Sequence, residues 1–194
     1  MKLTIQHQEM YSRGELLLRT FFGWLYIALP HGFLLFFVGL WSAILTFAAF
    51  WVVLFTGEYP RSFYEFQVGL MNWSLRMQSS MMNLVDGYPA LGLEAAGENV
   101  RLEAERPERL GRGTALLKAL FGWAYVLIPH GFCLWLRFIG TQILVFLAWW
   151  AVLFTGSYPA NWHAFNVGTL RWITRVQMYL GFMTDEYPRF SGRE

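Results

Sequence analysis

The sequence predicts an all-α integral membrane protein built from two tandem repeats. Three observations support this prediction: the composition, two very long apolar runs, and the return of the whole pattern after 99 residues. Of the 194 residues, 56% are hydrophobic and 19% are aromatic, but only 14% are charged. A soluble domain usually has about a quarter of its residues charged. The composition therefore favours a chain that lies in lipid.

Two apolar runs, at residues 16–56 and 115–156, are far longer than the stretch of about 18 residues that marks a membrane-spanning helix. The first contains Arg19 as its single charged residue, and the second contains Lys118 and Arg137. Each run has room for two crossings, so we expect a transmembrane hairpin in each repeat. The expected spans are about 17–37, 40–56, 116–136 and 138–155. A half-inserted helix followed by one span is the alternative.

The distribution of basic residues favours the hairpins. Lysine and arginine lie almost entirely outside the expected hairpin interiors, and basic flanks stay on the cytoplasmic side. Two hairpins put the N-terminal tail, the linker and the C-terminus together on that side. Arg137 falls where the far turn of the second hairpin is expected, and from there it would reach polar headgroups. We therefore predict a multi-pass protein with both termini cytoplasmic.

The repeat covers nearly the whole chain. A shift of 99 residues aligns GWLYIALPHGF (23–33) with GWAYVLIPHGF (122–132), VVLFTGEYP (52–60) with AVLFTGSYP (151–159), and DGYP (86–89) with DEYP (185–188). A tandem duplication explains this alignment, so we expect pseudo-two-fold symmetry between the repeats. The first repeat takes residues 1–92, a linker takes 93–99, and the second repeat takes 100–191.

Each repeat opens with a short polar segment in which apolar and polar residues alternate, at residues 2–8 and 99–105. This alternation predicts a strand. Because the two segments occupy equivalent places in the repeats, we expect them to pair with each other outside the membrane.

The FTGxYP motif ends each apolar run. Its glycine frees the backbone where a helix ends, and its proline is suited to the first turn of the next helix. We expect Tyr59 and Tyr158 at headgroup depth, where tyrosine is favoured. Apolar residues three and four apart then predict amphipathic helices at 61–84 and 160–183. We expect these helices to lie in the membrane interface, although packing of the apolar stripe against the other repeat is an alternative. The residues expected to hold them in the interface are Phe63, Trp73, Trp162 and Trp172.

No pattern in the sequence indicates a catalytic mechanism. The chain has no G-x-S-x-G elbow, no HExxH, no paired cysteines and no Gly-rich phosphate loop. We therefore expect no catalytic residues and no metal site, and we interpret Cys133 as a small packing residue. Asp86 and Asp185 open Tyr-Pro turns at the membrane surface. We expect them to cap these turns or to pair with Arg76 and Arg175.

The most prominent polar feature is the Pro-His-Gly sequence at 30–32 and 129–131. The simplest interpretation is that each histidine satisfies a backbone carbonyl freed by the preceding proline. A polar residue inside a span is also a functional candidate. If the two histidines face each other across the symmetry axis, they could ligate a haem or hold a quinone or a lipid headgroup. The candidate ligand-binding residues are His31, His130, Arg76, Arg175, Asp86, Asp185, Tyr59 and Tyr158.

The order Pro-His, apolar run, FTGxYP, VG…W..R and D.YP resembles that of an uncharacterised bacterial membrane-protein family classed only as a domain of unknown function. The chain resembles two such domains fused in tandem over nearly all of residues 1–191. The second copy fits better, because VGTLRW (167–172) and MTDEYPRF (183–190) are typical, whereas Asn72 stands in the first copy where Arg171 stands in the second. The resemblance implies a location in the bacterial inner membrane and brings no established activity.

Three classes of function remain open. The first is a non-catalytic scaffold or accessory subunit that binds lipids or partner proteins through interfacial amphipathic helices. The second is a small transporter or channel subunit that works as an oligomer. The third is a haem-, quinone- or lipid-headgroup-binding protein, or an enzyme, that uses the paired Pro-His sites. We expect no cofactor and no nucleic acid. The expected partners are membrane lipids and further copies of the chain or subunits of a membrane complex.

Overall fold

The computed structural model describes residues 1–95, 97 and 99–194, so residues 96 and 98 of the expected linker lie outside the described residues. Each half of the chain forms one short strand, one long helix and one shorter helix. The first half has β1 (Lys2–Ile5), then α1 (Arg13–Gly23), η1 (Trp24–Ala28) and α2 (Leu29–Thr56), and then α3 (Arg61–Met81). The second half has β2 (Val100–Glu103), then α4 (Arg112–Gly122), η2 (Trp123–Leu127) and α5 (Ile128–Thr155), and then α6 (Ala160–Leu180).

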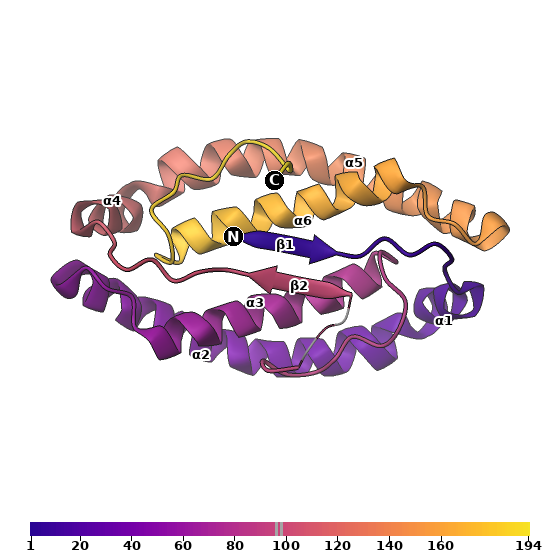
Figure 1. The fold of residues 1–194 in the computed structure, drawn as a ribbon, viewed down its shortest axis with the longest axis horizontal. Helices are drawn as coiled ribbons and strands as arrows, with labels where there is room; N and C mark the ends of the chain where they lie inside the picture. The colour runs from indigo at the N-terminus through magenta and orange to yellow at the C-terminus, as the bar shows by residue number, and fades with distance from the viewer. Residues whose placement is uncertain (96, 98) are drawn as a thin grey trace.

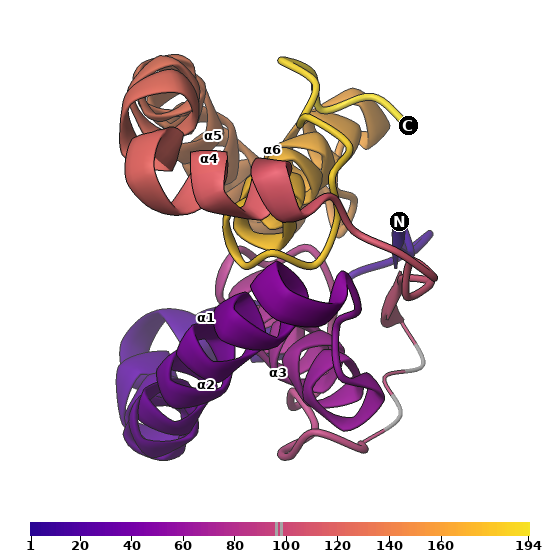
Figure 2. The ribbon, with the colours of Figure 1, turned by 90° about the vertical axis from the view of Figure 1, so that its left-hand side faces the viewer.

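The elements form three layers when the molecule is viewed from one end (Figure 2). The long helices form the first layer, α3 and α6 form the second, and the strands form the third, on the side where both labelled chain ends lie. In Figure 1 the long helices bow outward as two arcs, with α3, α6 and the strands between them. The second layer therefore covers the inner side of the first.

Residues 13–56 and 112–155 each form one continuous helix of 44 residues. The predicted hairpins are therefore wrong, since the expected turns near 38–39 and at 137 lie inside α2 and α5. A proline would interrupt the backbone hydrogen bonds, but none follows Pro30 or Pro129 within these helices. Each apolar run is long enough for two crossings, but it forms a single helix.

Arg137 shows why no polar turn is needed in the second half. Its Nε donates a hydrogen bond to Thr169 Oγ1 at 2.9 Å, and its Nη2 donates to the Phe165 carbonyl at 2.9 Å. Both partners lie on α6, so the guanidinium points into the protein. The prediction that Arg137 reaches headgroups from a far turn is therefore wrong.

The long helices pass through their prolines by means of the π-helical turns η1 and η2. A proline ring clashes with the carbonyl four residues earlier in an α-helix. Directly before Pro30, the amide of Leu29 donates instead to the carbonyl of Trp24, five residues back. The amide of Ile128 donates in the same way to the carbonyl of Trp123. The wider turn makes room for each proline ring, so the helix continues past it.

Each long helix ends at a glycine in the left-handed conformation, Gly57 at φ 77° and Gly156 at φ 74°. The carbonyl of Gly156 accepts a hydrogen bond from the Tyr11 amide at 2.8 Å, and that of Gly57 accepts one from the Leu110 amide at 2.8 Å. The start of each long helix therefore lies beside the end of the other, as Figure 1 shows at both tips. The FTGxYP motif is thus a joint between the two halves.

This joint also explains the position of the FTGxYP tyrosines. Tyr59 and Tyr158 are fully buried, so their rings contact protein, and their position at headgroup depth stays a prediction. The ring of Tyr59 packs edge-on against Tyr64, and the hydroxyl of Tyr158 accepts a hydrogen bond from Asn166 Nδ2 at 2.9 Å. Because the motif lies between the halves, its tyrosine fills the core there.

The predicted pairing of the two short strands is confirmed. β1 and β2 are antiparallel, with Leu3 opposite Leu102 and Ile5 opposite Val100. These four side chains are buried. The residues that alternate with them along both strands are exposed: Lys2, Thr4, Arg101 and Glu103. The sheet therefore has one apolar face toward the protein and one polar face away from it.

Candidate functional site

An aspartate ties the first DxYP turn to the start of the long helix in its own half. Asp86 Oδ1 accepts a hydrogen bond from Arg19 Nη2 at 2.7 Å. Asp86 Oδ2 accepts one from the amide of Ser12, the residue that caps the N-terminus of α1, at 2.7 Å. The side chain of Arg19 is 4% exposed, so this carboxylate balances a buried charge.

The second DxYP turn is built in the same way. Asp185 Oδ1 accepts a hydrogen bond from Lys118 Nζ at 2.8 Å, and Asp185 Oδ2 accepts one from the amide of Gly111 at 2.6 Å. Gly111 is the residue before α4, as Ser12 is the residue before α1. The side chain of Lys118 is 1% exposed. Both turns therefore hold a helix start and a buried cation together.

The partners predicted for these aspartates are wrong. Arg76 donates to the carbonyls of Ala90 and Gly92, at 3.1 and 2.6 Å. Arg175 donates to the carbonyls of Ser191 and Arg193, at 3.2 and 2.7 Å. The two arginines thus hold the loops that follow the DxYP turns.

The sequence did contain a signal for the true partners of the aspartates. Arg19 and Lys118 occupy the same position in the two apolar runs. A cation inside an apolar run needs a carboxylate partner. Because both runs carry a cation at this position, the partner carboxylate is expected at an equivalent position in both repeats.

Each Pro-His histidine accepts a hydrogen bond from a tryptophan on the second-layer helix. Trp73 Nε1 donates to His31 Nδ1 at 2.8 Å, and Trp172 Nε1 donates to His130 Nδ1 at 2.9 Å. Both histidines are fully buried. Because Nδ1 accepts, the neutral ring carries its proton on Nε2. The prediction that these histidines serve carbonyls freed by the prolines is therefore not what the structure shows, since the tryptophan indole is the partner.

The aromatic rings beside each histidine also come from its own half. The ring centroid of Tyr88 lies 5.4 Å from that of His31. The centroids of Tyr187 and Phe190 lie 5.3 and 3.9 Å from that of His130. The Nε2 atoms of both histidines lack a hydrogen-bond partner among the described residues. The histidines therefore lie in two separate aromatic surroundings and do not form a facing pair.

The apolar stripes of α3 and α6 pack against the rest of the protein and do not form a lipid-facing surface, and the position of these helices in the membrane interface stays a prediction. Trp73 and Trp172 are buried and bonded to the histidines. Phe63 and Trp162 are half-buried against clusters that include residues of both halves. These stripes therefore pack partly on the long helix of their own half and partly on the other half, which favours the packing alternative. Apolar periodicity alone does not distinguish a protein neighbour from lipid.

Exposed apolar side chains concentrate instead on the two long helices, and we call this surface the apolar face. Soluble proteins rarely expose a contiguous apolar patch of more than a few hundred Å². By length and composition, both helices are also long and apolar enough to cross a membrane. The apolar face includes Phe21, Leu25, Leu29, Phe33, Phe36, Leu40, Ile44, Phe47, Trp51 and Phe55, together with Leu120, Trp123, Ile128, Phe132, Trp135, Ile143, Phe146, Trp150 and Phe154.

Two pockets of about 280 Å³ each lie beside the DxYP turns. Arg76, Tyr88 and Pro89 line the first, and Arg175, Tyr187 and Pro188 line the second. These residues occupy equivalent positions in the two repeats.

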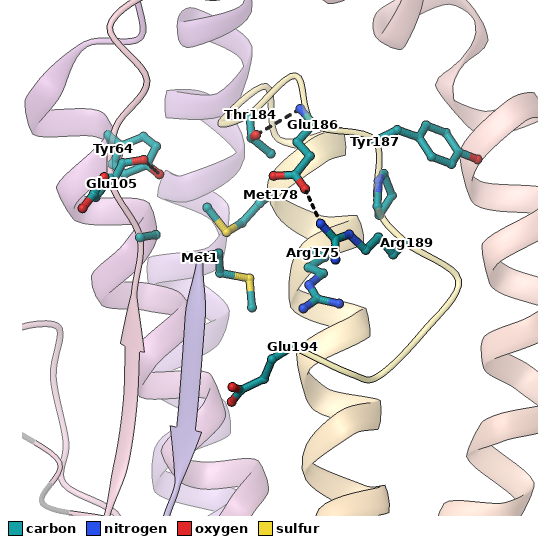
Figure 3. Close-up of a pocket in the computed structure, with 12 residues that line it drawn as sticks. Met1, Tyr64, Glu105, Arg175, Met178, Thr184, Glu186, Tyr187, Arg189 and Glu194 are labelled. Atoms are coloured by element: carbon teal, nitrogen blue, oxygen red, sulfur yellow. Dashed lines mark hydrogen bonds and ion pairs between the residues drawn. The ribbon is translucent and has the colours of Figure 1, made fainter.

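In the second pocket, Arg175 lies close to the pair formed by Glu186 and Arg189, over α6 and beside the loop that follows it (Figure 3). Burial and the neighbouring Arg171 and Arg189 lower the pKa of Arg175. Acidic residues line the same pocket, including Glu105 and Glu194. The pocket therefore does not select a ligand of one charge.

The comparisons with known proteins match one family, in the second half of the chain. The family described as a domain of unknown function (DUF4389) matches residues 118–192, a segment that contains α5, α6 and the second DxYP turn. The comparisons with curated proteins and with solved structures found no match to the chain. Over this segment the chain is similar to a family to which no activity is assigned.

Proposed function

We propose that this protein is a non-catalytic membrane protein that binds lipid through the apolar face of its long helices and serves as a scaffold or accessory subunit for partner proteins. The observation that carries the proposal is the position of the apolar face. Large apolar side chains point outward along both long helices, while α3 and α6 cover the opposite side (Figure 2). The lipid-binding surface is therefore assigned to the first layer and no longer to α3 and α6.

The energetics favour lipid as the main ligand of this face. Removing one large apolar side chain from water contributes about 1.5–3 kcal/mol. Phe36, Phe47 and Phe55 are each more than half exposed, and similar residues follow at every turn of both long helices. The free energy gained by burying all of these side chains in lipid exceeds the usual entropic cost of holding a protein at a surface. The face therefore provides ample free energy for stable membrane binding.

We propose that the chain arose by tandem duplication, has pseudo-two-fold symmetry and belongs to the bacterial inner membrane. The recurrence of every element about 99 residues later supports the duplication. The polar residues first considered as ligand-binding candidates instead hold the fold together: Asp86 and Asp185 bind buried cations, and His31 and His130 bind indoles. This favours a structural role over a catalytic one.

A flotation experiment tests the membrane proposal. The double variant Phe36→Glu/Phe47→Glu puts two charges on the apolar face, whereas Thr4→Glu puts a charge on the exposed side of β1. We expect the parent protein and Thr4→Glu to float with vesicles of phosphatidylcholine and phosphatidylglycerol. The double variant should bind at least about tenfold more weakly, because each charge removes a favourable apolar contact. Equal flotation of the double variant, or a parent protein that stays in the dense fraction, would contradict the proposal.

The alternative functions give different results in the same vesicles. A channel would make them permeable to ions or small solutes. A haem protein would absorb visible light, and native mass spectrometry would show any retained haem, quinone or lipid as added mass. The proposal expects no permeability and no visible chromophore. It also expects the protein to recover partner subunits when it is purified from its own membrane.

A further inference from the structure

We infer that both long helices lie in the plane of one membrane leaflet and do not cross the bilayer. This inference rests on the proposed function, because it takes the apolar face as the lipid-binding surface. It assigns one side of the molecule to the hydrocarbon of a single leaflet and the opposite side to water. Helix length, the position of the exposed charges and the layered arrangement lead to it.

The long helices are much longer than the hydrocarbon core of a bilayer is thick. A helix of 44 residues is about 66 Å long at a rise of about 1.5 Å per residue, whereas the hydrocarbon core of a bilayer is about 30 Å thick. Exposed apolar side chains continue from Phe21 to Phe55, which are 65% and 70% exposed. An upright helix would therefore leave large apolar side chains outside the hydrocarbon at one end or both.

The position of the strands also conflicts with upright long helices. In Figure 1 the sheet lies beside the middle of the long helices. Its outer side carries Arg101 and Glu103, which pair at 3.1 Å with side chains 73% and 53% exposed. Upright long helices would hold these charges, and the open edges of a two-stranded sheet, near the depth of the bilayer centre. Exposed charges and unpaired backbone groups are both unfavourable there.

If the long helices lie flat in one leaflet, their length is no longer limited by the hydrocarbon thickness and the charges of the sheet no longer lie at the bilayer centre. In Figure 2 the long helices form one side of the molecule, and the strands and both labelled chain ends lie on the other. A helix with its side chains is about 10–12 Å across, which fits within the hydrocarbon of one leaflet. The charged Arg13 and Arg112 stand exposed at the starts of the long helices, at the two tips of the molecule, where they can reach lipid phosphates.

Spin labels placed along the first long helix test this orientation. In a Cys133→Ser background, single cysteines at Phe21, Phe36, Phe47 and Phe55 receive a nitroxide, and a fifth at Arg101 serves as the control. The protein is bound to vesicles of phosphatidylcholine and phosphatidylglycerol. Power saturation with oxygen and with a water-soluble nickel chelate then gives the depth of each label. Flotation of the same samples reports binding separately.

The flat orientation predicts that all four helix labels lie at similar depths, within about 5–10 Å of the headgroup boundary, while the Arg101 label stays in water. The inference is overturned if the Phe36 label is deepest and the Phe21 and Phe55 labels reach water. It is also overturned if the apolar face is covered by a second copy of the chain, which would leave all four labels inaccessible to lipid. Failure of every labelled protein to float contradicts the proposed function itself.

Discussion

The indoles of Trp73 and Trp172 each donate a hydrogen bond to a fully buried histidine, at 2.8 and 2.9 Å. In each half the histidine lies on the long helix directly after its proline, and the tryptophan lies on the second-layer helix. A buried polar group without a partner costs more than a hydrogen bond contributes. Each pair therefore fixes the position of a second-layer helix relative to its long helix, and does so with the same two side chains in both halves.

Removing the indole donor should therefore destabilise both halves by similar amounts. We expect Trp73→Phe and Trp172→Phe each to lower the free energy of unfolding by about 1–3 kcal/mol, because His31 and His130 lose the partner of Nδ1. Trp149→Phe is the control, since its Nε1 donates to Thr20 in an exposed contact at 2.8 Å. Denaturant unfolding in detergent measures the effect. A loss for Trp149→Phe as large as for the other two would contradict this interpretation.

The burial of His163 predicts that stability depends on pH at the joint between the halves. Its Nε2 lies 3.1 Å from the Leu84 carbonyl, and its ring packs against those of His7 and Tyr158. Burial, with a smaller contribution from His7, lowers the pKa of His163 to about 4, although the bond to Leu84 opposes the shift. The equivalent position in the first half is Tyr64, whose hydroxyl donates to the Glu105 carbonyl at 2.8 Å.

Because the pKa of His163 is lower in the folded protein than in the unfolded chain, the unfolded chain binds more protons between about pH 6.5 and pH 4. We expect the contribution of His163 to stability to be complete above pH 6.5 and to fall by roughly 3 kcal/mol as the pH drops to 4. His163→Gln keeps a polar contact but does not titrate, so its unfolding should depend less on pH over this range. Identical pH profiles for parent and variant would show that His163 is not responsible.

At the scale of elements, the DxYP turns connect three parts of each half. The aspartate binds a cation within the long helix and the backbone at the start of the same helix, and the arginine of the second-layer helix binds the loop that follows. Burying a cation such as Arg19 or Lys118 is costly unless a carboxylate is paired with it. The turn, the helix start and the buried cation therefore depend on one another.

Neutralising the aspartate should break this connection. We expect Asp86→Asn and Asp185→Asn each to lower the free energy of unfolding by about 2–4 kcal/mol, since each leaves a buried cation without its counter-charge. Glu186→Gln serves as the control, because Glu186 pairs with Arg189 at 3.7 Å in an exposed position and such pairs contribute little. Thermal unfolding compares the variants. Replacing Lys118 by Met should recover part of the loss in Asp185→Asn, and no recovery would argue against the ion pair as the cause.

The whole molecule is held together where the halves exchange contacts. Each long helix is capped by a backbone amide of the other half, and the two strands form one sheet. The buried clusters also combine residues of both halves, for example Tyr59 and Val53 with Met178 and Met183. Neither half can therefore bury its own apolar surface without the other, so the two halves form one folding unit.

This arrangement predicts that the halves associate when they are made as separate chains. We expect two fragments, residues 1–94 with a tag and residues 95–194, to be purified as a complex when they are expressed together. The complex should have the same unfolding profile as the intact chain. A second fragment that starts at residue 112 lacks β2 and Leu110, and we expect it to be lost during purification. Independent folding of either half, judged by a cooperative unfolding transition, would contradict a single unit.

The sequence by itself determined the features that depend on neighbouring residues. Gly57 and Gly156 end helices because they adopt positive φ. Three- and four-residue periodicity located the helices after the FTGxYP motif. Alternation located two strands, and their equivalent places in the repeats predicted their pairing. Each of these signals is local or repeats in the chain, so no knowledge of tertiary contacts was needed.

Only the tertiary structure decided what those elements touch. The apolar stripe containing Trp73 faces protein and the one containing Phe47 is exposed, although both consist of the same kinds of residue. Asp86 pairs with Arg19, which is 67 residues away, and Tyr59 is buried at a joint with the other half. Burial and charge pairing depend on which surfaces meet in space. The composition of a segment indicates only that the segment avoids water. The fold decides whether other parts of the protein cover the segment or leave it exposed.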